Sequence, residues 1–140
     1  MIYTKMTNKA MVIAYNAHHG QVDKCGIPYI FHPIHVAEKM DDEISCTVAL
    51  LHDVVEDTQV TLEELEKVFP QKITEAVKLL TREKDIEYIK YIESIKDNSI
   101  ATKVKLADLE HNLDSSRMLP GSSLKRLRSR YKKAKEVLST

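Results

Sequence analysis

The 140-residue chain is poor in the residues that interrupt regular structure or cross-link it. It has three glycines and four prolines against many leucines, isoleucines, lysines and glutamates, and this composition favours helices. Its two cysteines, Cys25 and Cys46, form no CxxC pair and cannot build a disulfide framework. We therefore expect free thiols in a reducing compartment, and a cytoplasmic protein.

Net charge and long apolar runs are also missing. The 21 basic and 21 acidic side chains cancel, so the field of the whole protein gives no reason to expect nucleic acid or membrane binding. No run approaches the roughly 20 apolar residues that span a bilayer, and the N-terminus has no basic segment followed by an apolar core. These features predict a globular protein whose oligomeric state the sequence leaves open.

Apolar residues recur with helical spacing along nearly the whole chain. The pattern predicts helices over residues 6–17, 33–40, 44–55, 62–69, 73–80, 86–95, 100–107 and 124–138. A loop is expected from Gln21 to Phe31, which contains Gly26 and Pro28, and no stretch shows convincing strand alternation. The sequence therefore predicts an all-α fold, a compact bundle of about eight helices in which residues 1–140 form one domain.

The segment LLHDVVEDT, Leu50 to Thr58, places four polar side chains directly behind an apolar run. These are His52, Asp53, Glu56 and Asp57. Buried carboxylates are rare unless they are paired or bound to a metal, because an unsolvated charge is very costly. A divalent cation in a cleft is the simplest partner for them.

Two further segments carry groups that bind metals, His32 with His35 and Asp108 with His111. Imidazole and carboxylate together suit a first-row divalent ion such as Mn²⁺, Fe²⁺ or Zn²⁺. Taken singly, each group has a simpler explanation. A histidine before a proline is often a helix cap, and the acidic residues from position 56 onward also suit a solvated helix end.

The order of these motifs resembles a known family. AHHGQVDKCGIPYIFHPIHVA (17–37), ALLHDVVEDT (49–58) and KVKLADLEHNL (103–113) are similar to motifs of the HD-domain (p)ppGpp hydrolases of the RelA/SpoT group. They occur in the family's order and span most of the chain. The length is close to that of the single-domain small alarmone hydrolases.

The resemblance implies roles for particular residues. It implies one Mn²⁺, or another first-row divalent ion, held by His32, His52, Asp53 and Asp108. It implies that Glu56 and Asp57 position or deprotonate the attacking water, and that Lys24 and Asn112 contact the nucleotide. In a continuous helix, Glu56 lies on the same face as His52 and Asp53.

The implied reaction is attack of water on the phosphorus bonded to the ribose 3′-oxygen of a guanosine bis(diphosphate). It releases pyrophosphate and leaves GDP or GTP. Because no synthetase domain follows, we expect no synthesis of the nucleotide.

The chain departs from the family at positions that contact substrate. Asp23 stands where many members have an arginine that stacks on guanine, and Leu109 and Asp114 replace other arginines. A carboxylate cannot stack as a guanidinium does. These losses should weaken binding of a tetra-anionic nucleotide unless Arg117, Lys105 or a basic residue of the C-terminal helix replaces them.

Two alternatives remain open at this level. One is an HD-domain phosphohydrolase for another nucleotide, which the loss of the stacking arginine favours. The other is a non-catalytic nucleotide-binding module. Retention of both Glu56 and Asp57 beside a complete ligand set argues against the second alternative.

Overall fold

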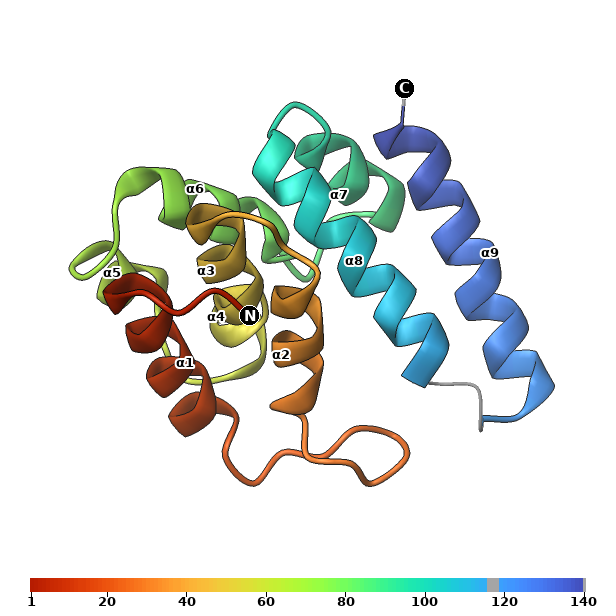
Figure 1. Cartoon of the computed structure of the whole chain (residues 1–140). Coiled ribbons are helices and arrows are strands. Elements are labelled where there is room, and N and C mark those ends of the chain that lie inside the picture. Colours follow the sequence, from red (N-terminus) through yellow and green to blue (C-terminus); the bar gives the residue numbers. More distant parts are fainter. Residues whose placement is uncertain (116–118, 140) are drawn as a thin grey trace.

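The computed structural model describes residues 1–115 and 119–139, and these fold as an all-helical domain (Figure 1). The helices are α1 (Lys5–His18), α2 (Phe31–Glu38), α3 (Glu43–Leu51), α4 (Val54–Asp57), α5 (Leu62–Glu66), α6 (Gln71–Leu80), α7 (Tyr88–Ile95), α8 (Ser99–Ser115) and α9 (Gly121–Leu138). Within this described part, the only β pairing is a single bridge between Val22 and Pro28. The prediction of an all-α bundle of about eight helices is confirmed, and two of the segments, α4 and α5, are only four and five residues long.

Helix α3 forms the centre of the bundle. It packs against α1, α2, α6 and α8, and Figure 1 shows it enclosed by its neighbours. Every residue from Ser45 to Leu51 is buried, because this run is apolar or small on all sides of the helix. Asp42 begins the helix by accepting a hydrogen bond from the Ser45 backbone N–H at 2.7 Å. The end of α3 therefore delivers the next residues, His52 and Asp53, into the interior.

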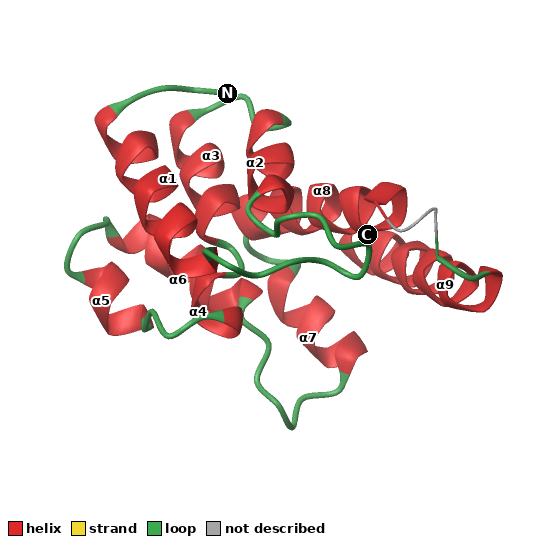
Figure 2. Ribbon diagram, turned by 90° about the horizontal axis from the view of Figure 1, so that it is seen from below, coloured by secondary structure: helices red, strands yellow, loops and turns green. Residues whose placement is uncertain are grey.

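The C-terminal helices form the other side of the molecule. Figure 2 shows α8 and α9 side by side, and α8 also packs against α2, α3 and α6. Helix α9 buries Ala134 and Leu138 on its inner face, while its basic residues stay on the outside. None of the described helices has the length and apolar character needed to cross a membrane.

Two details of the predicted helices are wrong. The predicted helix 44–55 is interrupted: α3 ends at Leu51 and α4 begins at Val54, after Asp53 with φ −107° and ψ 0°. Pro33 is the third residue of α2 rather than its first, since the helix begins at Phe31. A proline is tolerated there because the first-turn N–H groups have no partner within the helix.

Burial of α3 leads to a stability prediction. Leu50 is completely buried, and Leu50→Ala is expected to lower the free energy of unfolding by about 2–5 kcal/mol through lost burial and the cavity left behind. Val12, 60% exposed on α1, is the control, and Val12→Ala should change stability by less than about 1 kcal/mol. Urea unfolding followed by circular dichroism measures both. Equal losses in the two variants would contradict the central position of α3.

Candidate metal centre

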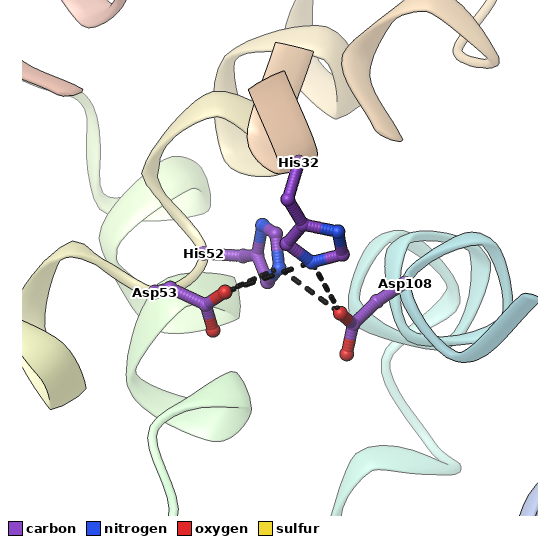
Figure 3. A group of neighbouring side chains, drawn as sticks. All are labelled: His32, His52, Asp53 and Asp108. Carbon is purple, nitrogen blue, oxygen red and sulfur yellow. Dashed lines mark hydrogen bonds and ion pairs between the residues drawn. The ribbon is translucent and has the colours of Figure 1, made fainter. Parts of the chain in front are cut away.

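Four predicted ligand residues converge in the interior. His32 comes from the first turn of α2, His52 and Asp53 from the break between α3 and α4, and Asp108 from α8 (Figure 3). Their ligand atoms all lie within 4.8 Å of one another. The Oδ1 atom of Asp108 is 2.7 Å from His32 Nε2 and 3.3 Å from His52 Nε2, and Asp53 Oδ2 is 3.0 Å from His52 Nε2.

The second nitrogen of each imidazole is already engaged. His52 Nδ1 lies 2.6 Å from the carbonyl oxygen of Ala49, which fixes Nδ1 as the donor. His32 Nδ1 lies 2.7 Å from His111 Nδ1, and the His111 ring stacks on both His32 and His35. In each histidine Nε2 is the nitrogen that faces the cluster. Orientation of a metal-binding imidazole through its other nitrogen is a common feature of metal sites.

Charges within the cluster are strongly coupled. Burial alone would lower the pKa of His52, but the carboxylates of Asp53 and Asp108 outweigh it and raise the pKa well above its usual value. Burial alone would raise the pKa of Asp108, yet Lys105 and the two imidazoles hold it well below its usual range. The site is therefore built for a carboxylate anion surrounded by positive charge, the environment that a bound cation also supplies.

Lys105 is the buried partner of Asp108. Its Nζ lies 3.0 Å from Asp108 Oδ2, the oxygen opposite the one that faces the histidines, and 5.1 Å from the centre of the Tyr91 ring. Asp108 thus offers one oxygen to the cluster and one to the lysine. The possibility that Lys105 replaces a missing substrate contact is wrong, because its ammonium group is committed to Asp108.

The donor set fits a divalent first-row metal ion. Two imidazole nitrogens and two carboxylate oxygens match the preference of Mn²⁺, Fe²⁺ or Zn²⁺ for mixed N and O ligands. A dication would also relieve the repulsion between Asp53 and Asp108, each of which raises the pKa of the other or is raised by it. The cluster can therefore hold a divalent metal.

The two acidic residues beyond the cluster take different positions. Because the helix is interrupted, Glu56 does not simply continue the face of His52, and its Oε1 accepts the Arg82 backbone N–H at 2.7 Å. The side chain of Asp57 is closer in charge to the cluster. Partial desolvation and the carboxylates of Asp53 and Glu56 raise the pKa of Asp57 to about 6. Both carboxylates are exposed at the edge of the cluster.

The loop before α2 contributes contacts that sequence reasoning missed. The hydroxyl of Tyr29 donates a hydrogen bond to Asp53 Oδ2, and its ring lies beside His18 and His32. Gln21 donates to the backbone oxygen of Asp57 at 2.9 Å and so ties the loop to the acidic pair. The motif PYIFHP includes this tyrosine directly before the histidine, but spacing alone does not show which way its ring points.

The predicted substrate residues share a cavity beside the metal cluster. Lys24 and Asn112 line a space of about 320 Å³ together with Tyr29 and Leu127. Asn112 Nδ2 also lies 3.3 Å from Asp108 Oδ1, so this cavity reaches the metal ligands. The structure therefore brings Lys24 and Asn112 together, while their role in binding stays a prediction.

Two departures from the family pattern have structural reasons. Asp23 Oδ1 accepts the backbone N–H groups of Cys25 and Ile27, at 2.8 and 3.0 Å, and so shapes the turn of the loop. Leu109 is buried in the hydrophobic core and does not face a nucleotide. Arg117, a candidate replacement, lies outside the described residues.

A helical bundle whose core holds a His, His-Asp and Asp set is the arrangement of an HD domain, and residues 10–119 match the family described as the HD domain. The chain belongs to this family. Its relatives are of the SpoT and RelA type. It is 35% identical to a guanosine-3′,5′-bis(diphosphate) 3′-pyrophosphohydrolase of Borreliella burgdorferi, over 94% of this chain and 21% of that protein.

Further comparisons agree. The chain is 35% identical to the bifunctional (p)ppGpp synthase/hydrolase SpoT of Escherichia coli, over 78% of this chain and 18% of that protein. It therefore spans about a fifth of the length of these curated relatives. A solved metazoan ortholog of SpoT, described as hydrolysing ppGpp, superposes with a TM-score of 0.85 at 27% identity, covering 99% of this chain and 88% of that one.

The Lys105–Asp108 pair generates a prediction about metal affinity. Lys105→Met removes the partner of Asp108 Oδ2, and we expect metal binding to weaken about 10- to 100-fold because the carboxylate loses its orientation. Competition with a chromophoric chelator measures the affinity, with Mn²⁺ and Zn²⁺ in turn.

Lys103 on the same helix is the matched control. It pairs with the exposed Asp41, away from the metal cluster, so Lys103→Met should leave metal affinity unchanged. Lys105→Arg, which retains the charge, should recover part of the affinity. Unchanged affinity in Lys105→Met would show that Asp108 needs no such partner.

Proposed function

We propose that the chain is a Mn²⁺-dependent hydrolase of guanosine 3′,5′-bis(diphosphate)-type alarmones. It releases pyrophosphate from the ribose 3′ position and leaves GDP or GTP. The observation that carries this proposal is the buried convergence of His32, His52, Asp53 and Asp108 beside an exposed acidic pair. The names of the similar proteins support the choice of substrate.

In this proposal the four clustered residues are the metal ligands, and residues 1–140 act as one phosphohydrolase domain. When bound, the metal ion lowers the pKa of a water molecule and polarises a phosphoryl oxygen. The free thiols Cys25 and Cys46 support a cytoplasmic location.

The acidic pair handles the water in two distinct ways. A carboxylate with a pKa of about 6 is close to the operating pH, so Asp57 is the better proton acceptor. Glu56 is held by the Arg82 backbone N–H and orients the water or the pair. Lys24 and Asn112 line the adjacent cavity and contact phosphate and ribose.

A second candidate is hydrolysis of a different nucleotide by the same centre. It is favoured by the loop, where Asp23 shapes the turn and provides no guanidinium to stack on guanine. A binding module without turnover is the third candidate.

A substrate panel separates these candidates. Purified protein with Mn²⁺ is expected to release pyrophosphate from ppGpp, and chelation by EDTA should stop the release. Turnover of other nucleotides with ppGpp untouched would favour the second candidate. Thermal stabilisation by ppGpp without any turnover would favour the binding module.

Variants of the centre separate metal binding from proton handling. Asp53→Asn should lower metal content and activity together. Glu56→Gln and Asp57→Asn should retain the metal and lower kcat by about 100-fold or more, because they remove water-handling carboxylates. Metal analysis of each purified variant, beside its kcat, is the measurement. Metal loss in Glu56→Gln equal to that in Asp53→Asn would mean that Glu56 is a ligand instead.

A further inference from the structure

A second cavity, of about 470 Å³, lies between α7 and α9 and is lined by positive charge. Its walls include Tyr88, Ser129 and four cations, Lys125, Arg126, Arg130 and Lys133. No carboxylate is among the lining residues. None of the four cations forms an ion pair with a carboxylate within residues 1–115 and 119–139.

The charge of α9 is unusual for a chain with no net charge. The helix carries seven basic side chains and a single carboxylate, Glu136. A concave surface of one sign raises the local concentration of ligands of the opposite sign. Arginine in particular binds phosphate through two parallel hydrogen bonds.

Tyr88 provides an uncommitted polar group in the same wall. Its hydroxyl oxygen is buried and has no hydrogen-bond partner among the described residues. The guanidinium carbon of Arg130 lies 4.4 Å from the ring centre and that of Arg82 lies 5.4 Å from it. A buried hydroxyl without a partner is costly, so a ligand that accepts its hydrogen bond would repay that cost.

The cavity is connected to the metal centre through Tyr88. Arg82, beside the Tyr88 ring, donates its backbone N–H to Glu56 of the acidic pair. On the other side, the Tyr88 and Tyr91 rings are 6.0 Å apart, and Tyr91 contacts Lys105, the partner of Asp108. A nucleotide with one phosphate group at the metal can therefore extend toward this cavity.

We propose that the cavity between α7 and α9 binds the 5′-diphosphate of the nucleotide, with Arg130, Arg126 and the Tyr88 hydroxyl as its contacts. This inference rests on the proposed function. It identifies the positive charge that replaces the family arginines, because Leu109 is in the core and Lys105 is paired with Asp108. The cations of α9 are thus part of the substrate site rather than a solvated face alone.

The test varies the 5′ end of the substrate and the cavity together. The metal-loaded enzyme is assayed with pGpp, ppGpp and pppGpp, which share the 3′-diphosphate and differ only at the 5′ position. For the native chain, KM should fall as 5′ phosphates are added. Arg130→Gln should raise KM for ppGpp about tenfold, the effect of one lost charge-assisted hydrogen bond, and should flatten the dependence on 5′ phosphate number.

Tyr88→Phe distinguishes binding from structure. Since the hydroxyl has no protein partner, its removal should not lower the melting temperature, yet it should raise KM about threefold or more. Arg128, on α9 but outside the cavity lining, is the matched control, and Arg128→Gln should leave KM and its dependence on 5′ phosphates unchanged. A dependence retained in full in Arg130→Gln and Tyr88→Phe would overturn the inference.

Two further arms separate other sources of the same result. If Arg130→Gln weakens inhibition by free pyrophosphate while the 5′ dependence persists, the cavity binds the product, and its assignment to the nucleotide is overturned. If the native chain hydrolyses none of the three nucleotides, the proposed function fails. Calorimetric binding of the same series to the metal-loaded protein then decides on the cavity: affinity that rises with 5′ phosphates only when Arg130 is present supports it, and affinity independent of Arg130 overturns it.

Discussion

The carboxylate of Asp108 is the group on which the rest of the site depends. It is buried, so an unpaired negative charge there would be very costly, and every neighbour acts to offset it. One oxygen faces His32 and His52, and the other is held by Lys105. These partners come from α2, the end of α3 and α8, so the charge is stable only when the three elements are packed together. The tight core around α3 and the polar centre are thus two parts of one arrangement.

That requirement also explains why the helix after α3 is interrupted. An unbroken helix would place His52 and Asp53 about 100° apart around the axis, and only one of them could point to a common centre. The break at Asp53 lets both side chains face the same point, with the oxygen of Asp53 3.0 Å from His52 Nε2. The short α4 that follows then presents Glu56 and Asp57 at the edge of the centre rather than inside it. A locally irregular backbone therefore separates the ligand role from the water-handling role.

The sequence was sufficient to predict the helical fold and the grouping of the four cluster residues. Apolar spacing locates helices because burial requires one face to be apolar, and charged residues amid an apolar run require a common partner. Three features were beyond it. The helix break depends on tertiary packing around His52, and the orientation of Tyr29 depends on the turn that Asp23 shapes. Lys105 could be recognised as basic, but only the structure shows that its partner is Asp108 instead of a ligand.

Net charge shows a similar difference between a total and its arrangement. A total of zero gave no expectation of an anionic partner, since it describes the field far from the molecule. Close to the surface, the basic residues of α9 are gathered against α7, while carboxylates gather around the metal centre at the break after α3. A nucleotide with phosphate groups at both ends matches this division: one end needs a metal ion held by carboxylates, and the other needs fixed cations. The buried hydroxyl of Tyr88 lies between the two regions, close to Arg130 on one side and to Tyr91 and Arg82 on the other. The distance between opposite charges along the protein surface, more than their sum, is therefore what the fold contributes to the choice of ligand.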